Sequence, residues 1–251
     1  LQQVEHFNNP GVTQNDGFKP VVRSFDRITR PEQIISSLQQ AVQVMLDPAD
    51  CGPACVSLSQ DVQGEVYDYP EEFFKERIHT IRRPKPDDFQ IKEAAELIKK
   101  SKKPIIIAGG GIFYSDATNE LSAFAKKHNI PVTQTVMGYS SIKKDHSHYL
   151  GTIGGLGGKA ANNLSKETDT AIAIGTKLAD FTTGSWANFE NPNFKLVSIN
   201  AARFDANKHM AQAIVGDAKV SLMELSQALG SWKADDGWYK KSRVELKNWE
   251  A

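Results

Sequence analysis

The stretch that most restricts the fold is residues 103–112, where three isoleucines and an alanine run directly into three glycines. Consecutive β-branched residues between Pro104 and Ala108 are typical of a strand buried on both faces of a sheet. Gly109, Gly110 and Gly111 would end this strand abruptly. Glycine at the carboxyl end of a parallel strand lets backbone amides approach a ligand. A helix pattern and a second strand pattern follow, so the stretch predicts a βαβ unit with a ligand site after its first strand.

The same alternation of strands and helices continues along the chain. Strands are expected at 104–109, 131–136, 169–175, 195–200 and 213–216, and helices at 89–101, 117–128, 157–165 and 217–229. Strands that alternate with amphipathic helices are typical of a parallel sheet with right-handed crossovers. The predicted fold class is therefore α/β, a Rossmann-like parallel sheet with helices on both faces.

The parts before and after this sheet have a different organisation. Apolar residues recur at helical spacing in residues 31–46, and a short strand pattern at 51–58 follows a turn. Arg82, Arg83 and Pro84 lie in a segment whose composition is that of a linker. We therefore expect a first α/β part at 1–75, a linker at 76–88, a central domain at 89–230 and a tryptophan-containing helical segment at 231–251.

Composition excludes several classes of function. The 251 residues contain 30 basic and 30 acidic side chains, so the formal net charge is zero. Neither a nucleic-acid partner nor a membrane-surface partner is expected from such a balance. Apolar runs are far shorter than the ~20 residues that span a bilayer. Cys51 and Cys55 have no further zinc ligands near them in the sequence, and we expect reduced thiols in a cytoplasmic protein.

Two local motifs allow a functional and a structural interpretation. Gly155, Gly157 and Ala160 match the dinucleotide-binding fingerprint formally, but residues 145–149 do not resemble the buried strand that it requires. A flexible turn that enters a helix is the preferred interpretation. Asp145, His146 and His148 could be combined into a metal site, although their turn-like context favours solvated loop residues, and no metal ligand is predicted.

Six segments, in this order along the chain, resemble the thiamine-diphosphate-dependent enzymes typified by acetolactate synthase. The segments are residues 52–63, 103–111, 130–138, 146–151, 174–180 with 183–184, and 215–218. Members of that family have a pyrimidine-binding domain, a central Rossmann-like domain and a diphosphate-binding domain. The resemblance implies that 1–75 is the C-terminal part of the first domain, 89–230 the whole of the second, and 231–251 a helical linker toward the third.

Within this family, residues 34–44, 47–53 and 60–74 are most similar to ring-opening C–C hydrolases of myo-inositol breakdown, which act on a small cyclic dione. An acetolactate synthase would usually have a Lys-Asp pair where this chain has Gln60 and Asp61. Two alternatives stay open: a carboligase with FAD in its central domain, and a non-enzymatic nucleotide-binding module.

The resemblance also implies a set of cofactor contacts. The family's activating glutamate would lie before this chain and its Mg²⁺- and diphosphate-binding motif after it. No catalytic residue is therefore predicted here, and the chain alone should be inactive. Because the family places its cofactors between subunits, the resemblance also implies a homodimer or a homotetramer. In the central domain, relatives bind FAD or ADP, and Lys177, Ala179 and Asn200 depart from the flavin-binding pattern. By position, the candidate nucleotide contacts are Gly110, Gly111, Thr135, Gly151, Gly175, Thr176, Asn200 and Asp217, with Val136, Met137 and Gly216 beside them.

Overall fold

A computed structural model describes residues 8–9 and 11–251. The first seven residues and Pro10, which belong to the predicted 1–75 domain, lie outside the described part. The chain divides into two units, residues 1–82 and residues 83–251. The boundary between the units falls inside the predicted linker, 76–88.

The first unit is built around a parallel pair of strands. Its elements are η1 (Gln14–Phe18), β1 (Ser24–Ile28), α1 (Gln33–Leu46), β2 (Ala54–Leu58), η2 (Val62–Gly64) and η3 (Glu71–Phe74). β1 and β2 pair in parallel from Ser24 opposite Ala54 to Ile28 opposite Leu58, and α1 connects them. Few side chains of this unit are fully buried, with Ile28 the most enclosed. Arg27 donates to Asp16 over 3.1 Å, which ties η1 to β1.

The second unit contains a six-stranded parallel sheet in the order β5-β4-β3-β6-β7-β8. Its strands are β3 (Pro104–Ala108), β4 (Val132–Gln134), β5 (Tyr149–Thr152), β6 (Thr170–Ile174), β7 (Lys195–Asn200) and β8 (Gln212–Val215). Its helices are α2 (Asp88–Lys99), α3 (Gly111–Tyr114), α4 (Thr118–His128), α5 (Lys159–Glu167), α6 (Asp180–Thr183), α7 (Arg203–Ala206), η4 (Lys208–Met210), α8 (Ala218–Leu229) and α9 (Asp236–Glu250). The predicted α/β class is confirmed.

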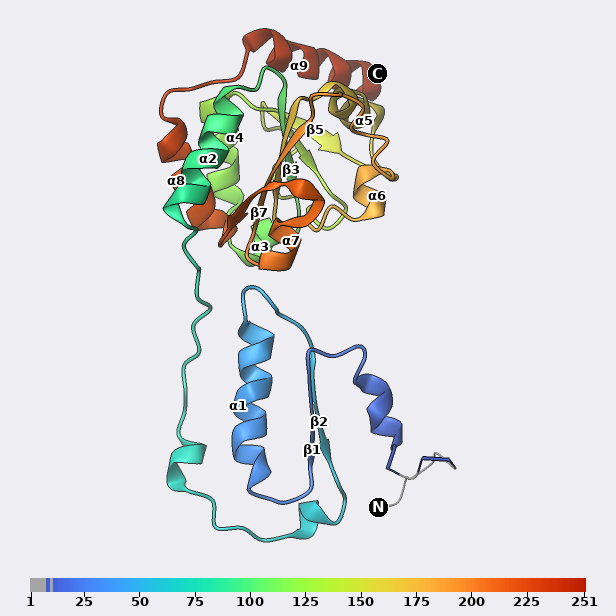
Figure 1. Cartoon of the computed structure of the whole chain (residues 1–251), viewed down its shortest axis with the longest axis vertical. Helices are drawn as coiled ribbons and strands as arrows, with labels where there is room; N and C mark the ends of the chain where they lie inside the picture. Colours follow the sequence, from blue (N-terminus) through green and yellow to red (C-terminus); the bar gives the residue numbers. More distant parts are fainter. Residues whose placement is uncertain (1–7, 10) are drawn as a thin grey trace. The chain divides into compact units, whose positions relative to one another are not determined.

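Helices cover both faces of this sheet, because side chains alternate along each strand. In β3, Ile106 and Ala108 pack with α2, α4 and α8, whereas Ile105 and Ile107 pack with α5 and α9. Figure 1 shows the first three helices on one side of the sheet and the other two on the opposite side. β3 and β6 lie at the centre with every residue buried, which explains their unbroken apolar sequences.

We did not predict the strand β5 from the sequence. A flexible turn after polar residues was expected there. The strand contains Gly151 and lies at one edge of the sheet, opposite Thr133 of β4. A short edge strand with a glycine carries little of the apolar pattern from which strands are predicted.

The other edge of the sheet is β8. The backbone amide of its last residue, Val215, donates over 2.9 Å to the side-chain oxygen Oε1 of Gln90 in α2. A helix side chain thus provides an acceptor beside the last strand.

Residues 231–251, predicted as a helical linker, contain α9 (Asp236–Glu250), and this helix packs on the sheet unit itself. Trp238 is 4% exposed, and its indole Nε1 donates to the carbonyl of Pro104 over 2.8 Å. Arg243 donates to the carbonyl of Ser147 over 2.9 Å.

Candidate functional site at the carboxyl edge of the sheet

The glycines that follow β3 and β6 meet at the carboxyl edge of the sheet. The two strands are hydrogen-bonded neighbours, so their ends lie side by side. The amide of Gly109 donates to the carbonyl of Ile174 over 2.8 Å, and that of Gly111 donates to the carbonyl of Gly175 over 2.9 Å. The structure therefore brings Gly109 and Gly111 against Gly175 and the end of β6, and Gly110 contacts the loop after β4 at Met137.

These glycines leave no room for side chains between the two strand ends. A Cβ atom on Gly111 would lie 2.5 Å from the Cα of Gly175, and one on Gly109 would lie 2.3 Å from the carbonyl oxygen of Gly175. Gly175 also has a φ of +59°, in the left-handed region that glycine adopts most easily. Packing of backbone against backbone accounts for the glycines here, and two of the expected amide donors are already paired.

The two candidate threonines bond within their own loops. Thr135 is buried, and its Oγ1 accepts a hydrogen bond from the amide of Gly138 over 3.0 Å. Thr176 Oγ1 accepts from the amide of Leu178 over 3.2 Å. Both hydroxyls therefore stabilise the turns that follow β4 and β6.

Asn200 stabilises the turn that follows β7. Its Oδ1 accepts from the amide of Ala202 over 3.0 Å, and its Nδ2 donates to the carbonyl of Thr176 over 3.3 Å. A ribose hydroxyl would have to compete with both of these partners. The asparagine thus links two neighbouring loops of the edge.

Asp217 is a buried helix cap. Its Oδ1 accepts from the amides of Lys219 and Val220 over 3.0 and 3.2 Å, which satisfies two free donors at the start of α8. Its other oxygen lies 3.1 Å from Nη1 of Arg83, and only 4% of the residue is exposed. The carboxylate is already fully used in helix capping and ion pairing.

Arg83 is a structural residue that the sequence reading missed. We interpreted it as part of a linker, but its guanidinium donates to the carbonyl of Ser115 and pairs with Asp217. The amide of Asp217 also donates to the carbonyl of Pro84 over 2.8 Å. The aspartate directly before a helix was the one available signal, since such a residue is typical of an N-cap.

Gly151 and the glycine-rich segment behind it do not form a free phosphate loop. Gly151 lies within β5, not in the loop beyond it. Residues 145–148 are turn, and the short strand β5 that begins at Tyr149 lies at the sheet edge with only Leu150 fully buried, so it is not the buried strand that the fingerprint requires. The amide of Gly155 donates to the carbonyl of Phe181 over 2.8 Å, and that of Gly157 to the carbonyl of Gly154 over 2.8 Å.

His148 is buried, which corrects the expectation that it is a solvated loop residue. Its Nε2 lies 3.2 Å from Oδ1 of Asn129, its Nδ1 lies 2.9 Å from Oγ of Ser147, and its ring packs on Tyr239. Burial lowers the pKa of His148 to about 4, with a contribution from the neighbouring His146. Within residues 8–9 and 11–251, no group of three or more His, Cys, Asp or Glu side chains is arranged to bind a metal ion.

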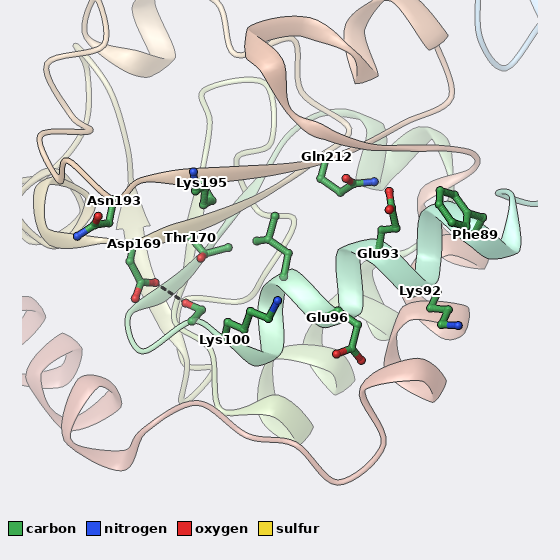
Figure 2. A pocket seen from close by; sticks show the side chains of 12 residues that line it. Phe89, Lys92, Glu93, Glu96, Lys100, Asp169, Thr170, Asn193, Lys195 and Gln212 are labelled. Atoms are coloured by element: carbon green, nitrogen blue, oxygen red, sulfur yellow. Dashed lines mark hydrogen bonds between the residues drawn. The ribbon is translucent and has the colours of Figure 1, made fainter.

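A surface groove of about 690 Å³ lies away from these residues. Figure 2 shows that its side chains come from α2 and from strand starts, among them Glu93 and Glu96 on the helix and Thr170, Lys195 and Gln212 on β6, β7 and β8. The candidate nucleotide contacts lie at or near the opposite ends of the strands. The groove is therefore not part of the carboxyl-edge site.

These features define a class of protein. A family model described as "Thiamine pyrophosphate enzyme, central domain" matches residues 91–225, the part of the chain that contains the sheet. The chain belongs to the thiamine pyrophosphate enzyme family.

Three individual relatives of this chain share the name of one enzyme. A protein of Clostridium perfringens (strain 13 / Type A) is 48% identical over 229 residues, which cover 91% of this chain and 36% of the relative. One of Bacillus licheniformis is 46% identical over 237 residues, 94% of this chain and 37% of the relative. One of Clostridium tetani is 42% identical over 250 residues, 100% of this chain and 39% of the relative. All three are named 3D-(3,5/4)-trihydroxycyclohexane-1,2-dione hydrolase.

The chain thus spans little more than a third of the length of these relatives. Across the described residues, no helix has the length and apolar character needed to cross a membrane.

Proposed function

We propose that this chain is the central part of a thiamine-diphosphate-dependent C–C hydrolase that opens the ring of 3D-trihydroxycyclohexane-1,2-dione to 5-deoxy-glucuronate in myo-inositol degradation. The observation that carries this proposal is 46–48% identity to relatives of that name over more than nine-tenths of the chain.

The residues present do not fit a thiamine diphosphate or Mg²⁺ site. The described residues include no cluster of three metal-binding side chains, and Asp217 is committed to Arg83 and to the cap of α8. The role of the chain is therefore to position other parts of the enzyme, and no step of the reaction is assigned to it.

A structural role for the candidate nucleotide contacts follows from their partners. The amides of Gly109 and Gly111 are bonded to β6 and the turn behind it. The side chain of Thr135 is bonded within its own loop, Asn200 to its own and a neighbouring loop, and Asp217 to the start of α8 and to Arg83. FAD or ADP would have to displace several of these bonds. A nucleotide is therefore not part of the proposal.

Residues 1–75 are proposed as the C-terminal part of a pyrimidine-binding domain. A two-stranded parallel sheet is marginal by itself, because parallel sheets are normally larger and covered on both faces. β1 and β2 form such a pair and contain few fully buried side chains. A homo-oligomeric enzyme in the cytoplasm completes the proposal, and the two free cysteines, Cys51 and Cys55, agree with a reducing compartment.

The test compares the chain with a completed protein. In the completed protein, the chain is extended by the segments through which the Clostridium perfringens relative exceeds it. Both proteins are supplied with thiamine diphosphate and Mg²⁺, and the trihydroxycyclohexane-dione and pyruvate are offered in competition. We expect the completed protein to consume the dione alone and the 251-residue chain to consume neither substrate.

Two results would contradict the proposal. Consumption of pyruvate in preference to the dione would assign the protein to the carboligases. Turnover of the dione by the chain alone would show that the chain contains the catalytic machinery. Thermal shift measurements with ADP and FAD test the nucleotide-binding alternative separately, because a ligand that binds the folded chain raises its melting temperature.

A further inference from the structure

The groove beside α2 has the size of a small-molecule site. Its volume is about 690 Å³, and such sites usually have volumes of roughly 300–1,000 Å³. Every residue that lines the groove lies between Phe89 and Gln212, so its walls belong entirely to the second unit. None of the residues considered at the carboxyl edge contributes to it. The groove is therefore a separate place at which a ligand can bind.

A buried hydroxyl group lies on the wall of this groove. Thr170 is only 3% exposed, and it is one of the lining residues (Figure 2). Its hydroxyl has no hydrogen-bond partner among the residues that the structure describes. The other buried threonines of this part of the chain all use their hydroxyls in hydrogen bonds; they are Thr133, Thr135, Thr168 and Thr183. A buried hydroxyl without a partner costs free energy, and an occupant of the groove can supply that partner.

Two further polar side chains lie beside this hydroxyl on the same face of the sheet. Lys195 of β7 is directly opposite Thr170, and Gln212 of β8 is opposite Val197. Because side chains alternate along a strand, Lys195 and Val197 point to the same face. That face is the one covered by α2, since Val197 packs in one core cluster with Ile98. Neighbouring strands are only about 4.8 Å apart, so the hydroxyl, the ammonium and the amide can contact one molecule.

Positive charge is left uncompensated at this end of the groove. Neither Lys100 nor Lys195, both lining residues, forms an ion pair within the described part of the chain. The acidic side chains nearby already have partners. Glu96 pairs with Lys99 over 3.0 Å, and Asp169 accepts hydrogen bonds from two backbone amides over 2.8 and 3.2 Å. An anion would therefore be attracted to the two free ammonium groups.

The anion that fits this end is a carboxylate and not a phosphate. Lys100 is the C-cap of α2, and the partial negative charge at the C-terminus of a helix disfavours a second negative charge on a ligand. Lysine also lacks the planar fork with which arginine binds phosphate through two parallel hydrogen bonds. A singly charged group held by two ammonium groups meets both conditions.

An acceptor for ligand hydroxyl groups lies further along the same helix. Glu93 also lines the groove, seven residues before Lys100, which corresponds to about 10 Å along the helix axis. Its carboxylate has no ion-pair partner among the described residues, and an ionised carboxylate accepts hydrogen bonds from hydroxyl groups. Leu97 lies between the two on the same helix and adds an apolar surface. The groove thus combines cations at one end with hydrogen-bonding groups along its length.

We propose that the groove binds a small polyhydroxylated carboxylate, that is, a sugar acid. Its carboxylate lies between Lys100 and Lys195, and its hydroxyl groups bond to Thr170, Gln212 and Glu93. The proposed product of the enzyme, 5-deoxy-glucuronate, belongs to this chemical class, and to that extent the identity of the ligand rests on the proposed function. A product bound in the groove would stabilise the folded sheet unit by mass action, away from its carboxyl edge.

Binding is measured on the 251-residue chain with D-glucuronate as the probe. We expect D-glucuronate to raise the melting temperature and to shift the amide resonances of residues 170, 195 and 212 in a nuclear magnetic resonance titration. myo-Inositol has the hydroxyl groups without the charge, and acetate has the charge without the hydroxyl groups. Each should bind about ten-fold more weakly or less. Absence of shifts at these residues, equally tight binding of myo-inositol, or tighter binding of inorganic phosphate would overturn the proposal.

A pair of lysine substitutions provides the matched control. Lys195→Gln removes the charge of an exposed side chain, so the chain should fold normally and bind D-glucuronate about ten-fold more weakly. Lys102→Gln changes an exposed lysine near the groove that does not line it, and the affinity should stay within about two-fold of the original. Equal losses in the two variants would indicate a general attraction of charge and would contradict a defined site.

The role of the buried hydroxyl is tested by Thr170→Val, which keeps the shape of the side chain. Since the hydroxyl has no partner in the described protein, the melting temperature of the unliganded chain should not fall. The affinity for D-glucuronate should fall by about three-fold or more, because one hydrogen bond to the ligand is lost. A lower melting temperature with unchanged affinity would assign the hydroxyl to the fold and contradict its role in binding.

Failure of the proposed function gives a different pattern of results. If the chain binds D-glucuronate through Lys195 while the completed protein does not consume the dione, the groove is supported and the hydrolase is contradicted. If the completed protein consumes the dione while neither D-glucuronate nor 5-deoxy-glucuronate binds in the groove, the hydrolase is supported and this inference is overturned.

Discussion

Gly111 and Gly175 meet backbone to backbone, with the amide of Gly111 donating to the carbonyl of Gly175 over 2.9 Å. This contact joins the two central strands just beyond their carboxyl ends. It depends on the absence of a side chain on either residue.

An added methyl group at this contact should destabilise the fold. We expect Gly111→Ala to lower the free energy of unfolding by about 1–3 kcal/mol, as other overpacked sites do. Gly175→Ala should lower it further, because its φ of +59° adds roughly 1–2 kcal/mol of strain. Urea denaturation measures both. Gly155→Ala is the control, since its new Cβ would only reach ordinary contact distance, 3.5 Å from the ring of Phe181. Equal stability of Gly111→Ala and Gly155→Ala would contradict the packing argument.

Capping and ion pairing by Asp217 can be separated by two substitutions. Asp217→Ser keeps a side-chain oxygen for the amides of Lys219 and Val220 but loses the ion pair with Arg83. Asp217→Ala loses both, so it should be less stable than Asp217→Ser by about 0.5–2 kcal/mol. Chemical denaturation of the two variants tests this order. Indistinguishable stabilities would show that the cap contributes nothing.

Trp238 should anchor α9. Trp238→Ala removes a buried ring and leaves the Pro104 carbonyl without its indole donor, so we expect a loss of about 3–5 kcal/mol in the free energy of unfolding. Trp249→Ala, at a residue that is 50% exposed on the same helix, should cost much less. Circular dichroism during denaturation compares the two. A similar loss in both variants would mean that helix content, not the buried ring, determines the effect.

Stability should fall as the pH drops below about 6.5, because His148 is held neutral in the folded protein. Its pKa there is about 4, whereas in the unfolded chain it has the ordinary value of 6.5. The unfolded chain therefore binds more protons between these two values, and protonation favours unfolding. One such histidine changes the free energy of unfolding by at most about 1.4 kcal/mol per pH unit.

The measurement is the free energy of unfolding in urea at about pH 5 and about pH 7. His148→Gln should reduce the difference between the two values. His79→Gln, at an exposed histidine, serves as the control. His128 adds to the wild-type difference, because burial lowers its pKa as well. An unchanged pH dependence in His148→Gln would contradict the prediction.

The central strands could be predicted because burial on both faces gives them unbroken apolar sequences. β3 and β6 are of this kind, with every residue buried. β5 could not be predicted in the same way, since it is short, contains Gly151 and pairs on one side only. Local sequence patterns therefore predict strands that are buried on both faces, but they do not predict short strands at the edge of a sheet.

The residues of the carboxyl edge were predictable, but their partners were not. Glycines after strands pointed to the place where Gly111 and Gly175 meet. Pairing of Asp217 with Arg83, which is 134 positions away, depends on tertiary structure alone. The burial of His148 is likewise produced by Tyr239 and Asn129 from distant elements.

The hydrogen bond from the Val215 amide to Gln90 has a consequence for how copies of the protein behave in concentrated solution. An exposed edge strand offers its unpaired amides to any other strand, and such pairing leads to aggregation. Gln90 occupies the amide through which β8 would otherwise start a ladder with a foreign chain. We therefore expect Gln90 to hinder the pairing of β8 with a strand of another copy. Gln90→Ala should make the protein more prone to form fibrils without removing any part of its core.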